Sequence, residues 1–168
     1  MPISAASWFS FLAAGCSSPN GWQLDEIAAG DRAFDSSRLR FVDPEGASPL
    51  AFELLRVGDS VEAFICLSRN HLSPSLSETP LESQSVTALF RIDGEEFEEK
   101  IPFREGGMKV RLSSETASRL TQALQDEKEI GILIDGFEEN LTSDRFSGIF
   151  RKFLGGRPRE FFFKGQIE

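Results

Sequence analysis

Val86-Thr87-Ala88-Leu89-Phe90-Arg91-Ile92, followed by Asp93-Gly94, is the stretch that decides the fold. Apolar side chains alternate along it, as expected of a β-strand with one buried face. Asp-Gly between two such runs is the strongest short-range signal for a two-residue hairpin turn. We therefore expect a return strand over residues 95–103, in which Pro102 indicates a sheet edge or the strand's end.

The return strand carries a run of acidic side chains, which we interpret as a solvated strand edge. A calcium loop needs oxygens that a turning backbone wraps around one point, whereas alternating strand residues point to opposite faces. Charges on an edge strand also deter pairing with other chains. The acids concerned are Asp93, Glu95, Glu96, Glu98 and Glu99.

Similar patterns on both sides of this hairpin predict further strands. Most of them alternate, and the last is an apolar run that indicates a strand buried on both faces. Gly58-Asp59 joins two of them into a second hairpin. The expected strands cover residues 38–42, 50–57, 60–67, 108–112 and 130–134.

One segment after residue 112 has clear helical spacing. Ser113 is placed to cap a helix, with Glu115 in the first turn. Ala117, Leu120 and Leu124 then form one apolar stripe, so we expect a helix that ends near Asp126.

Residues 142–154 are ambiguous. Their phenylalanines have helical spacing, with Thr142 or Ser143 as a cap, which favours a helix over part of 144–154. The alternative is a strand through Phe146 that turns at Gly148. Gly155-Gly156 ends the segment in either case. The fold class is therefore mainly β with one or two short helices, arranged as an antiparallel β-sandwich.

Composition indicates one globular domain. The chain has 168 residues, enough to enclose a core. It contains 16 Phe and no Tyr, so its aromatic side chains serve burial rather than hydrogen bonding. The net charge of −9 argues against nucleic acid as a partner.

The C-terminal region is basic in this acidic chain. From Arg145 onward there are six basic and two acidic residues. This region either contacts acidic lipid head groups or the chain's own acidic face, or it is simply a solvated face. Phe161-Phe162-Phe163 forms a buried closing strand or, if exposed, a partner site. The candidate partner-binding residues are Arg151, Lys152, Arg157, Arg159, Phe161, Phe162 and Phe163.

Residues for catalysis or metal binding form no recognisable set. His71, the only histidine, lies in the Ser- and Pro-rich segment 68–85, which we expect to be a long loop. Cys66 falls in a strand pattern and is expected to be buried. We find no nucleophile elbow, phosphate loop or Cys-x-x-Cys motif. We therefore expect no enzyme, no metal and no cofactor.

Near the N-terminus, an uncharged run over residues 6–11 leads into Leu12-Ala13-Ala14-Gly15-Cys16 and then Ser17. This segment resembles the lipobox of bacterial lipoproteins. The resemblance implies that Cys16 takes a diacylglycerol and becomes the new N-terminus. We accordingly divide the chain into a signal segment (1–15), a tether and lead-in (16–37) and a single β-rich domain (38–168). Ser17, in place of Asp, implies sorting to the outer membrane, facing the periplasm.

Residues 1–15 contain no Lys or Arg, although a secretory signal normally opens with positive charge. Either the true start lies upstream, or these residues form a short buried helix in which Cys16 is an ordinary apolar residue. In the second case we expect a cytosolic, acidic partner-binding protein such as a secretion chaperone.

The order of elements also resembles the periplasmic family of invasion-associated locus B-like proteins. The similarity lies in Ile92-Asp93-Gly94, Val110-Arg111-Leu112, the Leu120 to Leu124 stripe, and residues 132–137. That family usually carries cysteine pairs that this chain lacks. The resemblance implies a β-sandwich and no functional residues. The lipobox, followed by a domain of this size that is mostly strands, leads us to expect a lipid-anchored, non-catalytic binding or assembly factor that has a protein partner in the bacterial envelope.

Overall fold

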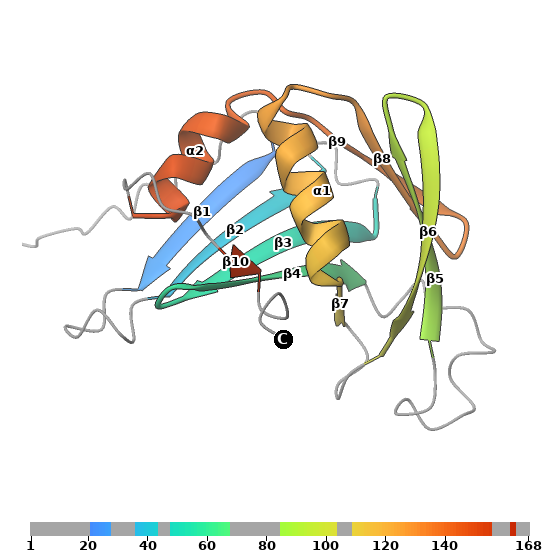
Figure 1. Cartoon of the computed structure of the whole chain (residues 1–168), viewed down its shortest axis with the longest axis horizontal. Helices are drawn as coiled ribbons and strands as arrows, with labels where there is room; N and C mark the ends of the chain where they lie inside the picture. Colours follow the sequence, from blue (N-terminus) through green and yellow to red (C-terminus); the bar gives the residue numbers. More distant parts are fainter. Residues whose placement is uncertain are drawn as a thin grey trace, which may run out of the picture.

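The computed structural model describes residues 21–27, 36–43, 48–67, 85–103, 109–155 and 162–163. It is mainly β, with two sheets and two short helices, as the sequence predicts (Figure 1). In chain order, the elements are β1 (Trp22–Ile27), β2 (Ser36–Val42), β3 (Leu50–Val57), β4 (Ser60–Leu67), β5 (Ser85–Ile92), β6 (Glu95–Pro102), β7 (Lys109–Arg111), α1 (Ser114–Gln125), β8 (Ile130–Ile134), β9 (Phe137–Leu141), α2 (Phe146–Phe153) and β10 (Phe162–Phe163).

The larger sheet, sheet A, has the order β1-β2-β3-β4-β10, and β7 also pairs with β4. Its pairs are antiparallel except that of β10 with β4, which is parallel. The hairpin of β3 and β4 turns at Gly58-Asp59, as predicted. The strand expected over residues 38–42 is confirmed as part of β2.

The smaller sheet, sheet B, has the order β6-β5-β8-β9 and is antiparallel throughout. The predicted Asp93-Gly94 hairpin is confirmed, and Pro102 lies at the end of the edge strand β6. A second Asp-Gly pair, Asp135-Gly136, joins β8 to β9, which the sequence analysis missed. Both pairs have positive φ at both residues, as a type I′ turn requires (48° and 84°, 51° and 82°).

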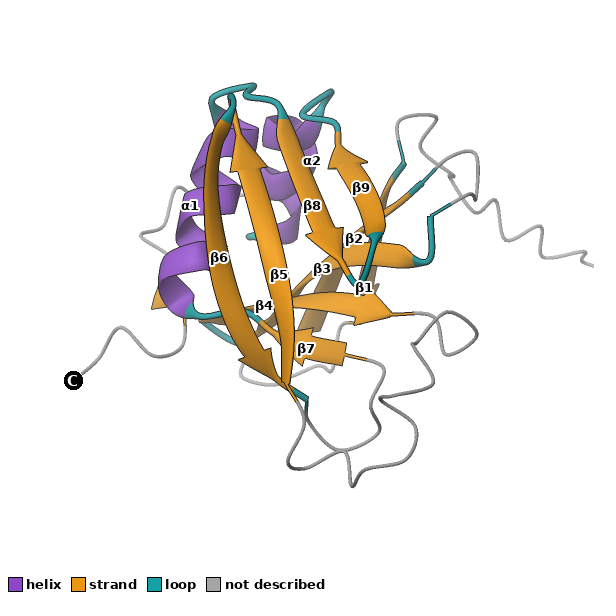
Figure 2. Ribbon diagram, turned by 90° about the vertical axis from the view of Figure 1, so that its right-hand side faces the viewer, coloured by secondary structure: helices purple, strands orange, loops and turns teal. Residues whose placement is uncertain are grey.

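The core lies where both sheets and both helices meet. α2 packs on β1 and β2, and α1 packs on β4, β8 and α2. Figure 2 shows both helices behind sheet B, on its inner side. Phe146, Phe150 and Phe153 of α2 are buried and stacked, with ring centroids 5.1 and 5.8 Å apart. Burial of each ring stabilises the fold by about 1.5–3 kcal/mol.

Residues 22–27 were expected to belong to the tether and lead-in over 16–37, outside the domain. That interpretation is wrong, because these residues form strand β1 and the domain begins before residue 38. Trp22 is 1% exposed, and its Nε1 donates to the carbonyl oxygen of Thr142 at 2.8 Å. Gly21 is required just before it, because its φ is +81° and a Cβ would lie 2.7 Å from the carbonyl oxygen of Val42.

The two helices begin in different ways. Ser113 caps α1 as predicted, since its hydroxyl accepts from the backbone N–H of Thr116 at 3.2 Å. The helix predicted within 144–154 is confirmed, but neither Thr142 nor Ser143 caps it with a side chain. Arg145 takes the cap position of α2 in the left-handed conformation (φ 59°). Gly155, with φ of 78°, follows its end as predicted.

Some predictions fall on residues that the structure does not describe: the signal segment and Cys16, and the loop with His71. Within the described part of the chain, neither helix is long and apolar enough to cross a membrane.

Candidate functional site

The outer face of sheet B carries a row of side chains that three strand pairings bring together. Glu96 lies opposite Arg91, Arg91 opposite Gly131, and Gly131 opposite Asn140. The side chains of Glu96, Arg91 and Asn140 are exposed. Alternate residues of β5, such as Phe90 and Ile92, point to the core instead. In Figure 2 the four strands stand in front of both helices, which are therefore on the opposite side of the sheet.

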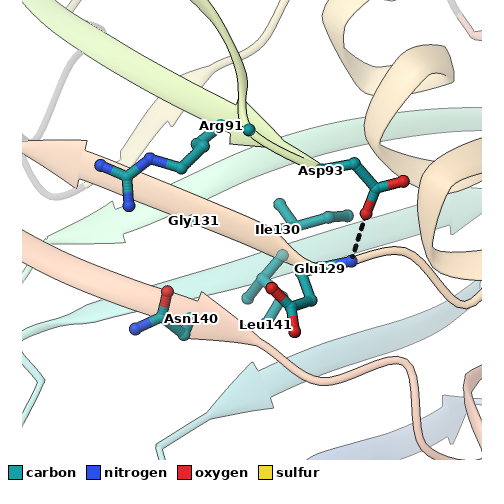
Figure 3. A pocket seen from close by; sticks show the side chains of 8 residues that line it. Arg91, Asp93, Glu129, Ile130, Gly131, Asn140 and Leu141 are labelled. Atoms are coloured by element: carbon teal, nitrogen blue, oxygen red, sulfur yellow. Dashed lines mark hydrogen bonds between the residues drawn. The ribbon is translucent and has the colours of Figure 1, made fainter.

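A pocket of about 370 Å³ opens beside this row. Gly131 makes room for it, because an added Cβ would lie 3.4 Å from Asn140 Oδ1 and 3.7 Å from Arg91 Cβ. Figure 3 shows Arg91 and Asn140 on either side of Gly131, with Asp93 and Glu129 toward the strand ends. The lining residues are Arg91, Asp93, Gly94, Glu129, Ile130, Gly131, Asn140 and Leu141.

Ion pairs hold Arg91 in place at the edge of the pocket. Its Nε lies 3.1 Å from Glu96 Oε1, and its Nη1 lies 3.2 Å from Glu138 Oε1. The hydrogen bond to Glu96, with the charge of Glu138, raises the pKa of Arg91. Arg91 therefore stays charged and pairs with a carboxylate of β6, on one side of β5, and with a carboxylate of β9, which lies beyond β8 on the other side.

The other end of the pocket is fixed by backbone contacts. Asp93 Oδ1 accepts from the backbone N–H of Glu129 at 3.2 Å, the dashed line in Figure 3. The backbone N–H of Asp93 in turn donates to the carbonyl oxygen of Glu129 at 3.1 Å. These two bonds join the β5–β6 turn to the segment that enters β8.

The polar groups of the pocket suit the binding of a cation. Among the described residues, its lining contains two carboxylates, one guanidinium and one amide. Glu96 and Glu138 add two more carboxylates around Arg91. The surroundings are therefore acidic overall and favour a cationic group that also forms hydrogen bonds.

A second polar cluster lies on the outer face of sheet A. Glu53 is 2% exposed and lies 2.5 Å from Lys109 Nζ, while Cys66 Sγ lies 3.8 Å from its other oxygen. Cys66 is half-buried, so the expected burial of its thiol is confirmed only in part. Burial first, and then the charge of Glu53, raises the pKa of Cys66 to about 11. Because the thiol stays protonated at neutral pH, this cluster is not suited to nucleophilic chemistry.

Glu139 is the second buried acid. It points inward from β9 and is 6% exposed, and one of its oxygens has no hydrogen-bond partner among the described residues. Burial raises its pKa, and the charge of Asp43 acts in the same direction. Hydrogen bonds from Ser48 and from the backbone of Asn140 oppose that shift.

The structure describes only some of the residues that the sequence singles out for lipidation or partner binding. Arg151 and Lys152 are exposed on α2, and Phe162 and Phe163 form β10 beside Ser60 and Val61 of β4. A closing strand is therefore confirmed. The remaining predicted residues lie outside the described ranges, namely Cys16, Arg157, Arg159 and Phe161.

The pocket around Gly131 was not predicted from the sequence. One available signal was Gly131 within an otherwise apolar strand, since a glycine there often marks close approach of another group. Asp135-Gly136 was a second signal, because an Asp-Gly hairpin turn predicts a return strand, which here carries Glu138 and Asn140.

No family model matches the chain, and the searches of curated proteins and of solved structures found no similar protein.

Proposed function

We propose that this chain is a lipid-anchored, non-catalytic binding or assembly protein of the bacterial envelope. It is held at the outer membrane through Cys16, faces the periplasm and binds a protein partner. The membrane part of this proposal rests on the Leu12–Cys16 segment and its resemblance to a lipobox. The position of β1 supports it, because Trp22 enters the core only six residues after Cys16.

The proposal that the protein binds a partner rests on one observation, the pocket around Gly131 on the outer face of sheet B. The carboxylates of Asp93 and Glu129 line it, and Glu138 lies next to it. An arginine or lysine side chain of a partner protein has the charge and hydrogen-bond donors that these groups accept. Sheet B is then the recognition face, and the rest of the domain supports it.

An intact mass of the mature protein tests the membrane part. The gene is expressed in a bacterial host with its genomic upstream region, beside a Cys16→Ser variant. We expect a chain that begins at Cys16 and carries acyl groups, and a variant without them. An uncleaved, unmodified wild-type chain would rule out the lipid anchor and favour the cytosolic alternative.

A pair of valine substitutions tests the recognition face. Gly131→Val fills the pocket, whereas Thr87→Val places valine at an exposed position of the same face, outside the pocket lining, where it replaces another β-branched side chain. We expect Gly131→Val to lose crosslinks between a photoreactive group at residue 133 and envelope proteins, while Thr87→Val keeps them. Both variants should keep the wild-type melting temperature, because valine is favoured in strands. Equal crosslinking by both variants would contradict the proposal.

A further inference from the structure

Helix α2 has an apolar face in the core and a cationic face in solvent. Phe146, Phe150 and Phe153 are buried, whereas Arg151, Lys152 and the capping Arg145 are exposed. Within the described residues, no ion pair involves any of these three cations. Ser147 and Gly148, also exposed, are small, so the cations project furthest from this face.

This cationic face lies beside the point where the chain leads toward Cys16. The ring of Trp22 is 4.8 Å from that of Phe146, and Trp22 Nε1 is bonded to the carbonyl oxygen of Thr142. The backbone steps from Cys16 to Gly21 span at most about 18 Å when fully extended. The eight residues of α2 extend about 12 Å. An acyl group on Cys16 therefore keeps the start of α2 close to the membrane surface.

The acidic part of the molecule lies elsewhere. The chain has a net charge of −9, and sheet B carries Glu96, Glu98 and Glu138 exposed on its outer face. α2 lies over β1 at one side of the molecule in Figure 1, and sheet B stands at the other side. An anionic membrane attracts the α2 side and repels the sheet B side.

We propose that the exposed face of α2, formed by Arg145, Arg151 and Lys152, docks on the anionic phosphate head groups of the membrane that holds Cys16. The contact orients the domain so that the pocket of sheet B points away from the bilayer. This inference rests on the proposed lipid anchor and adds the surface that the anchor brings into contact.

Lysine footprinting tests the contact without depending on whether the cell acylates Cys16. The full-length chain with Cys66→Ser is coupled through Cys16 to a maleimide lipid in vesicles. The vesicles contain either phosphatidylcholine alone or phosphatidylcholine with one-third phosphatidylglycerol. Acetylation rates of Lys152 and of Lys100, which is exposed on β6, are then measured by mass spectrometry.

We expect Lys152 to be acetylated at least about threefold more slowly on the anionic vesicles, with Lys100 unchanged. Arg145→Gln combined with Arg151→Gln should remove this protection. Arg119→Gln combined with Lys128→Gln is the matched control, because it removes two exposed cations away from α2 and should keep the protection. Melting temperatures show whether each variant is folded.

Equal Lys152 rates on both kinds of vesicle, or equal effects of the two double variants, would overturn the docking proposal. Neither result bears on the lipid anchor, because coupling to the maleimide lipid supplies the attachment. Conversely, an intact mass that shows an unacylated Cys16 would rule out the lipid anchor. The acetylation rates of Lys152 would still show whether α2 binds anionic head groups.

Discussion

Glu139 couples the stability of the fold to pH. Its raised pKa means that the folded state favours the protonated carboxyl group. Its contribution to stability is therefore full below the ordinary pKa of 4.5 and is lost as pH rises through the higher pKa of the folded state. We expect Glu139→Gln to be more stable than the wild type at pH 8 and to lose this difference near pH 4.

Urea unfolding between pH 4 and pH 8 measures this effect. Ser48→Ala is the companion variant, because the Ser48 hydrogen bond lowers the pKa of Glu139. Its removal should make the loss of stability with rising pH steeper than in the wild type. Parallel pH profiles of the wild type and Glu139→Gln would show that Glu139 does not titrate differently in the folded state.

Cys66 reports on the electrostatics of the outer face of sheet A. Its pKa of about 11 is raised by burial and by Glu53, and lowered by Lys109. In a Cys16→Ser background, Glu53→Gln should speed alkylation by iodoacetamide at pH 8, and Lys109→Gln should slow it. Mass spectrometry gives the rates. A change in the same direction for both variants would contradict this assignment of causes.

At the scale of elements, α2 contributes strongly to the fold for its length. Phe150 stacks on both Phe146 and Phe153, and Phe146 meets Trp22 of β1. Phe150→Ala leaves a cavity among these rings and should lower the free energy of unfolding by about 3–5 kcal/mol. The adjacent, half-buried Ile149 is the control. Ile149→Ala should lower the free energy of unfolding, measured with denaturant, clearly less than Phe150→Ala does. Equal losses in the two variants would mean that the ring stack is not the source of the stability.

The elements that the sequence predicted are those specified by local pattern. The stretch 86–94 contains both an alternating strand and its turn, and Ser113 to Asp126 contains its own cap and stripe. The missed strands β1 and β9 contain several charged or amide side chains, and each pairs with a strand next to it along the chain, β1 with β2 and β9 with β8. Trp22 is buried by Phe41 and Phe146, which lie far along the chain.

The pocket could not be predicted for the same physical reason. It depends on the register of three strands, which places Arg91 opposite Gly131 and brings Glu138 within 3.2 Å of Arg91. The two Asp-Gly turns fix the β5–β6 and β8–β9 registers, but local sequence does not specify how β5 pairs with β8. The cationic side chains of α2 were foreseen as a group, but their position beside Trp22 follows from packing.

At the scale of the whole molecule, α2 and sheet B present opposite charges. α2, with its exposed cations, and sheet B, with its exposed carboxylates, lie on different sides of the molecule; Figure 1 shows the positions of the two elements. If the proposed lipid anchor holds the domain on a short tether, this division lets one face meet the membrane while the other stays accessible. The two proposals therefore support each other, because docking through α2 presents the Gly131 pocket to a partner.

The acidic edge of sheet B has a further consequence for the state of the protein in solution. β6 is an edge strand of eight residues, and its exposed Glu96 and Glu98 oppose pairing with a second copy. Glu96→Thr with Glu98→Thr removes this repulsion and raises strand propensity. We expect concentration-dependent dimers or aggregates in size-exclusion chromatography with light scattering. Glu115→Gln with Glu127→Gln, exposed outside the strands, makes the same charge change without a β-branched residue at Glu127, whose φ is 57°, and should stay like the wild type. If both double variants assembled equally, net charge rather than the β6 edge would be what keeps the wild-type chains apart.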